Sequence, residues 1–201
     1  MAIYTNMNEI PAGTQPIFES SLLKSSISGH IWDCLVVSET GSGANITRTP
    51  IVVPNCTPVK VGGFTHNGNG LQERYATIAG VADKIGVVGS VALVKDNLTT
   101  FTGNESFFTN KAGVDSKVYE VYGDEYDGDI FGVTKEAFTT ASQANIAVGN
   151  YVVVDGNGKY VAQTTKPTAS SYGFIGQIHS LYTNNFYTMV RIYVLQNVDN
   201  N

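Results

Sequence analysis

The chain has 201 residues, a length that fits one domain or two small domains with a substantial buried core. Charged residues make up only 14% of the sequence, against roughly 25% in an average soluble domain, and the net charge is −5. With so few basic residues the chain lacks the cationic stripe that nucleic acid requires, and no stretch approaches the roughly 18 uninterrupted apolar residues of a membrane-spanning helix. We therefore expect no direct contact with nucleic acid and no membrane insertion, and the N-terminal stretch predicts no standard export signal because it lacks a basic region followed by an apolar run.

Asn, Thr, Ser and Gly dominate the remaining polar residues, and these favour turns and strand faces over helix interiors. The composition predicts a mainly β fold: a small β-barrel or β-sandwich with an extended N-terminal arm and one or two short helices. The arm is expected over residues 1–20, where Pro11 and Pro16 disfavour helix.

Residues 21–106 are predicted to form a β-rich region with long loops. The segments at 31–38 (IWDCLVVS) and 51–53 (IVV) have the composition of strands, and 85–94 (IGVVGSVALV) that of a buried strand with Gly89 as a possible bulge. Long loops rich in glycine and polar residues separate them.

A short helix is expected within this region, in LQERYATIAG. Leu71, Tyr75 and Ile78 recur at helical spacing, and Gly80 follows where the helix would end.

Residues 107–201 are predicted to form a barrel-like or sandwich-like region, which forms either its own domain or one domain with 21–106. Apolar segments there alternate with turn residues every 8 to 12 positions, a spacing typical of small all-β folds.

Both faces of the last predicted strand are largely apolar, so we expect it to be central in a two-layer fold or covered by another subunit. Arg191 would pair either with a carboxylate across such an interface or with a partner inside the chain. The face predicted as a candidate subunit interface comprises Tyr187, Met189, Arg191, Tyr193 and Leu195.

The sequence DGNGK at 155–159 raises the question of a phosphate-binding loop. Such a loop requires a longer glycine-rich motif that opens a helix, whereas Lys159 precedes another strand-like segment. Asp155, Gly156, Asn157 and Gly158 instead predict a β-hairpin turn.

The acidic run GDEYDGD, with Asp124, Glu125, Asp127 and Asp129, suggests either a weak calcium site or a solvated turn. The spacing fails the EF-hand pattern because Ile130 stands where that loop needs glycine. The solvated turn is therefore the favoured interpretation.

No other group of residues predicts catalysis. The histidines His30, His66 and His179 lie far apart, and His179 is expected to be a packing residue. Cys34 and Cys56 match no redox or zinc motif and are expected to be free, buried thiols. We expect no enzyme activity, no catalytic residues, no cofactor and no metal.

Three stretches within residues 107–197, GDIFGVTKEAF, VGNYVVVDGNGKY and the closing GFIGQI…VRIYVL pattern, resemble small virion proteins of tailed bacteriophages, namely capsid decoration (cement) and head auxiliary proteins. The resemblance implies a β-rich protein without catalysis that binds the major capsid protein on the outside of the shell and stabilises it. It further implies a trimer or another symmetric homo-oligomer, located on the virion surface after assembly in the host cytoplasm.

Three alternatives remain open. The first is another virion component, such as a tail, connector or head-fibre protein. The second is a glycan-binding adhesion module that uses exposed aromatic residues among the tyrosines and Trp32. The third is a hydrolase whose dispersed residues, such as Asp127 or His179, assemble only in space.

Overall fold

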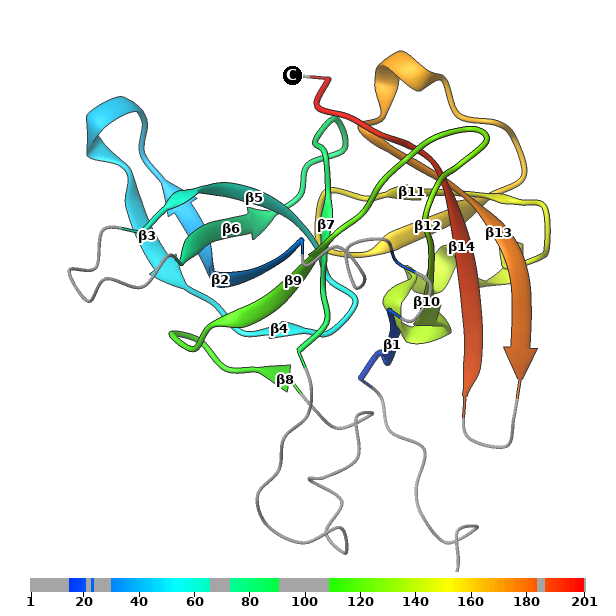
Figure 1. Ribbon diagram of the computed structural model, residues 1–201, viewed down its shortest axis with the longest axis horizontal. Helices are drawn as coiled ribbons and strands as arrows, with labels where there is room; N and C mark the ends of the chain where they lie inside the picture. The colour runs from blue at the N-terminus through cyan, green and yellow to red at the C-terminus, as the bar shows by residue number, and fades with distance from the viewer. Residues whose placement is uncertain are drawn as a thin grey trace, which may run out of the picture.

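The computed structural model describes residues 15–20, 23, 30–65, 73–90, 109–183 and 187–200 (Figure 1). This part of the chain is mainly β, as predicted. Its strands form a closed barrel and, beside it, a second curved sheet (Figure 1). Residues 1–14 of the predicted arm, Leu71 and His66 lie outside the described residues.

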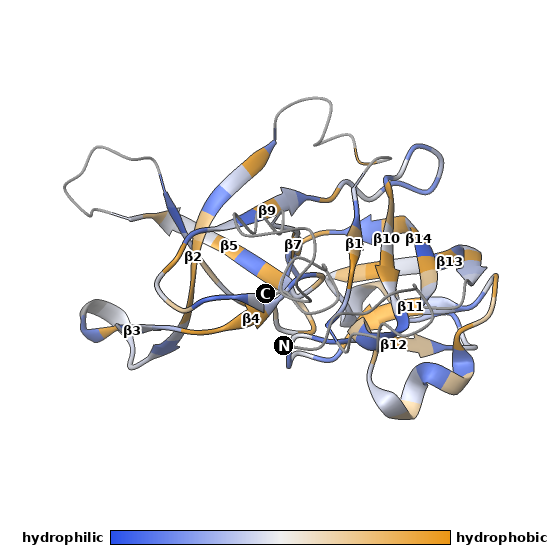
Figure 2. Ribbon diagram, turned by 90° about the horizontal axis from the view of Figure 1, so that it is seen from below, coloured by the Kyte–Doolittle hydropathy of each residue, from blue (hydrophilic) through white to orange (hydrophobic). Residues whose placement is uncertain are grey.

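The barrel is built around β2, whose neighbours in the sheet are β3, β6 and β9. β2 pairs with β6 in parallel, and β9 pairs with both β7 and β2, which closes the ring β2-β6-β5-β7-β9. β5 is buried at its start, at Pro58 and Val59, and exposed at its end, from Gly62 to Phe64. Hydrophobic and hydrophilic colours follow one another along this strand (Figure 2). The strands are β2 (Ile31–Thr40), β3 (Thr47–Pro50), β5 (Pro58–Phe64), β6 (Arg74–Ile78), β7 (Gly86–Val88) and β9 (Ser116–Glu120).

The second sheet is antiparallel throughout, in the order β1-β10-β14-β13-β11-β12. β12, at one end of the sheet, approaches the other side of the sheet, because its Tyr160 forms a parallel bridge with Phe138, which lies shortly after β10. The sheet therefore also curls towards a barrel. Its strands are β1 (Phe18–Glu19), β10 (Ile130–Thr134), β11 (Tyr151–Val154), β12 (Tyr160–Gln163), β13 (Phe174–Thr183) and β14 (Thr188–Asn197).

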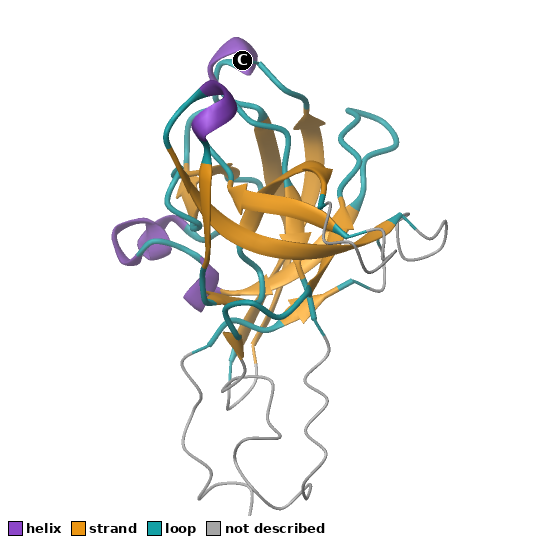
Figure 3. Cartoon of the chain, turned by 90° about the vertical axis from the view of Figure 1, so that its left-hand side faces the viewer, coloured by secondary structure: helices purple, strands orange, loops and turns teal. Residues whose placement is uncertain are grey.

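The remaining described elements are short. A small sheet joins β4 (Val53–Pro54) to β8 (Thr109–Asn110). Single 3-10 turns lie at the periphery of the strands (Figure 3), namely η2 (Gly43–Asn45), η5 (Lys135–Ala137), η6 (Thr140–Asn145) and η7 (Ala169–Ser171).

The prediction of a helix within 71–80 is wrong, because Arg74–Ile78 forms strand β6. The segment contains Tyr75, Thr77 and Ile78, which favour strands, and β6 receives hydrogen-bonding neighbours on both sides, β2 and β5. Tertiary pairing overrides the helical spacing of three apolar residues.

The two β structures share a core. Ile85 and Val87, from the barrel, pack in the same cluster as Phe131, Phe174 and Ile192 of the second sheet. A smaller cluster around Cys34, Val59 and Val118 fills the barrel itself. Strand β9 lies after residue 107 yet completes the barrel, so strand pairing crosses the sequence boundary between 21–106 and 107–201.

Buried Asn197, at the end of β14, links the two structures. Its side-chain oxygen accepts from the backbone N–H of Ile85 at 2.8 Å, and its amide donates to the carbonyls of Ile85 and Val121 at 2.8 and 2.7 Å. These bonds satisfy backbone groups that burial would otherwise leave unpaired.

The last residues of the predicted arm are docked on the second sheet. β1 pairs with the edge of β10, and the Phe18 ring packs 5.2 Å from Tyr119 and 6.2 Å from Phe131 between ring centroids. Gly89 makes room for this ring, because a Cβ atom on Gly89 would collide with Phe18.

Candidate functional site

The DGNGK segment is a β-hairpin turn, which confirms the sequence prediction. It joins β11 to β12, and the Asp155 carboxylate accepts from the backbone N–H groups of Asn157 (2.7 Å) and Lys159 (3.0 Å). Gly156 and Gly158 have φ values of 79° and 87°, which only glycine adopts at little cost. The Lys159 ammonium donates a hydrogen bond to the Glu136 carbonyl at 2.7 Å. This contact holds the lysine within the fold, in place of the phosphate contact that a phosphate-binding loop would make.

The acidic run forms a solvated turn, as favoured from the sequence. Asp124 accepts from the backbone N–H groups of Tyr126 and Asp127, at 2.8 and 3.0 Å, while buried Asp129 turns away and accepts from the N–H of Tyr122 at 2.7 Å. Across the described residues, no three His, Cys, Asp or Glu side chains gather in a way that would hold a metal ion.

The histidines do not converge in the described part of the chain. His30 lies 3.5 Å from Glu120 and is exposed. His179 is also exposed, at an irregularity in the β13–β14 register between Ile178 and Ser180, so its expected packing role is wrong. A β-bulge turns the side chain out of the core, and sequence spacing does not reveal bulges.

Cys34 and Cys56 are free and buried, as predicted. Burial raises the pKa of the Cys34 thiol to about 12, against an opposing effect of Arg74. Such a thiol stays protonated at neutral pH and is a poor nucleophile.

Four of the five residues predicted as a subunit interface lie on β14, Tyr187 directly precedes it, and several of the five are engaged within the chain. Met189 is buried. The Arg191 guanidinium forms two hydrogen bonds with Glu19, each 2.9 Å long, so its partner is intramolecular. The Tyr193 hydroxyl accepts from the backbone N–H of Gly128 at 3.0 Å.

The other two face different surroundings. The Tyr187 ring lies 6.5 Å from that of Tyr182, between centroids, near the end of the β13–β14 hairpin. Leu195 lies at the opposite end of β14, in a groove. A subunit interface on this face stays a prediction.

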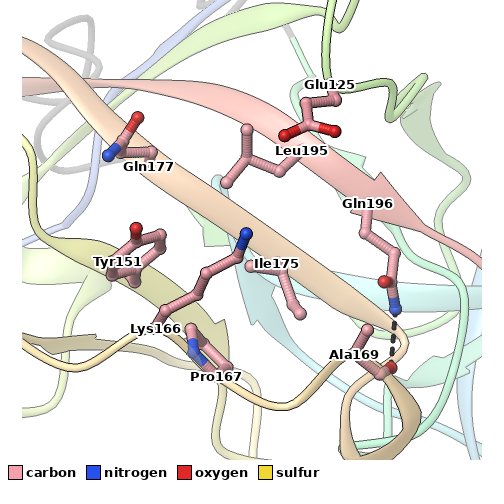
Figure 4. A pocket seen from close by; sticks show the side chains of 9 residues that line it. All are labelled: Glu125, Tyr151, Lys166, Pro167, Ala169, Ile175, Gln177, Leu195 and Gln196. Carbon is pink, nitrogen blue, oxygen red and sulfur yellow. Dashed lines mark hydrogen bonds between the residues drawn. The ribbon is translucent and has the colours of Figure 1, made fainter.

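That groove has a volume of about 290 Å³ (Figure 4). Its base is Ile175 of β13 and Leu195 of β14, and Tyr151, the first residue of β11, stands beside them. Lys166, from the loop after β12, and Glu125, from the acidic turn, lie at its rim. The remaining lining residues are Pro167, Ala169, Gln177 and Gln196.

A bulge in β14 shapes this groove. Val194 pairs with Gly176 and Gln196 with Ile175, so Leu195 is an extra residue on β14. In a regular strand neighbouring side chains point to opposite faces, but here both Leu195 and Gln196 line the groove, while Asn197 turns into the core.

The second hollow, about 180 Å³, is lined by Lys60, Arg74, Lys84 and Glu120 among others. The Lys60 ammonium lies 2.6 Å from Asp83 and 3.2 Å from Asp199. These carboxylates raise the pKa of Lys60, and the hydrogen bond to Asp83 is the main cause. The cluster therefore has the character of a structural ion-pair network rather than a ligand site.

A third feature is the end of the β13–β14 hairpin, which extends past the neighbouring strands (Figure 1). Tyr182 and Leu181 are 53% and 39% exposed there. No Asp, Glu, Lys or Arg occurs from Ser180 to Val190. Within the described residues, β13 has no strand neighbour on its outer side from Ser180 to Thr183, because β11 pairs only with Gly176 and Gln177.

No sequence motif predicts the groove. Tyr151, Lys166 and Gln177 lie in three separate segments without a shared motif, and the bulge at Leu195 appears only in the strand register. Glu125 belongs to the acidic run and Leu195 to the predicted subunit interface, and the fold brings both residues to this groove.

No protein-family model, no curated protein and no solved structure matches this chain. The helical segments that the structure describes are all too short and too polar to cross a membrane.

Proposed function

We propose that this chain is a structural bacteriophage virion protein that binds the outer surface of the capsid and stabilises it, as a decoration or cement protein. The observation that supports this most directly is the uncharged end of the β13–β14 hairpin, where Leu181, Tyr182 and Tyr187 lie beside a strand edge that no described strand pairs with.

Exposed strand edges are normally protected by charged residues, prolines or covering elements, because a free edge pairs with other chains. The hairpin end has no charged residue from Ser180 to Val190. An unprotected edge with exposed aromatic side chains is typical of a surface that a partner covers.

The chemistry of this surface suits a large protein partner. Tyr182 is 53% exposed and Leu181 is 39% exposed, so a partner that covers the hairpin end removes aromatic and aliphatic surface from water. Each partner contributes roughly 800 Å² to a standard interface. We take the major capsid protein as that partner. Symmetric association of the decoration protein, as a trimer for example, would add multivalency, so that many weak contacts hold one lattice together.

The test is co-sedimentation with capsid shells that lack this protein, using the wild type and the Tyr182→Ser/Tyr187→Ser double variant. Wild-type protein is expected to saturate at a fixed copy number per shell and to raise the temperature at which shells rupture. The double variant is expected to bind at least tenfold more weakly, about 1.4 kcal/mol.

Tyr126→Ser is the matched control, because Tyr126 is a 90% exposed tyrosine in the acidic turn, outside the hairpin. It should bind shells like the wild type. Failure of the wild type to sediment with shells, or equal binding by wild type and double variant, would contradict the proposal.

A further inference from the structure

We infer that the groove between β13, β14 and the loop after β12 binds a neutral saccharide unit. This inference goes beyond capsid binding and concerns a different surface, since the groove lies at the Leu195 end of β14 and the hairpin surface at the Thr188 end.

The charges at the groove favour a neutral ligand. Lys166 and Glu125 are both exposed at the rim, and neither side chain has a hydrogen-bond or ion-pair partner among the described residues. One ammonium and one carboxylate give no net charge, so the groove has no preference for phosphate, sulfate or a metal cation. Each group can still hydrogen-bond a hydroxyl, the ammonium as donor and the carboxylate as acceptor.

Two glutamines present fixed acceptors. The Gln177 amide nitrogen donates to the Gly149 carbonyl at 3.0 Å, and that of Gln196 donates to the carbonyls of Ala169 and Tyr172 at 2.9 and 2.7 Å. These bonds orient both amide groups and leave each side-chain oxygen available to accept. Groups oriented before binding lose little entropy when a ligand arrives.

The apolar surface of the groove suits the C–H face of a sugar ring. Tyr151 lies directly opposite Gln177 across the β11–β13 pair, which places an aromatic ring beside an amide (Figure 4). Ile175 and Leu195 form the apolar base next to them. A sugar ring has an apolar C–H face and a rim of hydroxyl groups, so it suits an aromatic wall bordered by acceptors and one donor.

The structure also shows why this site is stable without a ligand. Ile175 is only 3% exposed, and Pro167 is buried as well, so the base of the groove belongs to the packed fold. The bulge that places Leu195 and Gln196 on one side is anchored by Asn197, whose side chain is bonded in the core. Bulges that re-aim side chains are common beside binding sites.

The experiment is a glycan array that carries neutral, sialylated and sulfated oligosaccharides, followed by calorimetric titration with the best neutral ligand. Binding is expected for neutral glycans and not to require an acidic group. Tyr151→Ser and Lys166→Ala are each expected to weaken that binding about tenfold. Because Lys166 is exposed in a loop, its variant tests the site without a risk to folding.

The two proposals fail separately. Tyr182→Ser should retain glycan binding and lose capsid affinity, whereas Tyr151→Ser should lose glycan binding and retain capsid affinity. The inference is overturned if the wild type binds no neutral glycan more tightly than the Tyr151→Ser variant does, or if binding requires an acidic group on the glycan. It is also overturned if Tyr151→Ser lowers the copy number on shells, because the groove would then be a contact with the capsid protein.

Discussion

Arg191 and Glu19 are 172 positions apart in the sequence, yet their side chains form a two-point ion pair. The Nε and Nη2 atoms of the guanidinium each donate to one carboxylate oxygen at 2.9 Å. The pair ties β1 to β14 across β10, to which both strands are hydrogen-bonded. The hydrogen bond to Glu19 raises the pKa of Arg191, whose side chain thus keeps its charge throughout the accessible pH range.

We expect Arg191→Lys to loosen β1, because a lysine ammonium cannot reproduce the two parallel hydrogen bonds of a guanidinium. The Thr134 N–H donates to the Ile17 carbonyl at 3.2 Å, so its hydrogen exchange reports the docking of this segment. Exchange at Thr134 should be faster in the variant.

Arg48→Lys serves as its control. Arg48 also pairs with a glutamate, Glu39, but on the β2–β3 hairpin. It should leave Thr134 exchange unchanged. Equal exchange rates in wild type and Arg191→Lys would show that the ion pair does not hold β1.

Gly89→Ala is expected to destabilise the protein by about 1–3 kcal/mol, the usual cost of overpacking a core. The added methyl group would collide with the Phe18 ring and lie 2.9 Å from the Tyr119 ring. Urea denaturation measures the loss. Gly63→Ala is the matched control, since a Cβ atom on Gly63 meets nothing within 4 Å. A loss of unfolding free energy as small as that of Gly63→Ala would mean that the Phe18 ring does not pack against Gly89 in solution.

Tyr160→Phe is expected to leave stability unchanged or raise it by about 1 kcal/mol, because a buried polar group without a partner costs free energy. The Tyr160 hydroxyl is buried and has no hydrogen-bond partner among the described residues, while its ring packs against Phe131, Phe138 and Phe174. Burial, with a smaller effect of Cys56, raises its pKa well above the usual value, so the hydroxyl stays neutral.

Tyr193→Phe removes the same atom from a tyrosine whose hydroxyl is bonded to Gly128. This variant should be the less stable of the two in thermal denaturation. The opposite order would show that the Tyr160 hydroxyl has a partner in solution.

The contribution of Asp115 to stability is expected to fall as the pH rises above about 4, because the pKa of Asp115 is higher in the folded chain than its usual value of 3.8. Loss of hydration is the main cause, followed by the negative charge of Glu73. An acid whose pKa rises on folding binds more protons in the native state, so its contribution is greatest below the unfolded pKa and is lost through the folded pKa.

Asp115→Asn should therefore flatten the dependence of unfolding free energy on pH from about 4 upwards, measured by urea denaturation at successive pH values. Glu73→Gln should act in the same direction by removing the neighbouring charge. A pH profile that stays as steep in both variants as in the wild type would contradict this assignment.

Several local features followed from the sequence alone. The mainly β character, the hairpin at Asp155–Lys159, the solvated acidic turn and the buried thiols were all predicted, and the structure confirms them. Each of these features depends on neighbouring residues or on composition. Asp155 and two glycines define the conformation of their own turn, and short polar residues favour turns and strand faces over helix interiors.

The tertiary structure decided whatever depends on pairing between distant segments. Residues 74–78 became a strand because β2 and β5 flank them, against their helical spacing. The β9–β2 pairing closes the barrel, the Glu19 carboxylate meets Arg191, and the bulge at Leu195 brings Gln196 to the groove beside Tyr151. Hydrophobic periodicity records which face of a segment is buried, but it contains no information on which strand becomes the neighbour or where the register shifts, because those are set by the packing of the whole core.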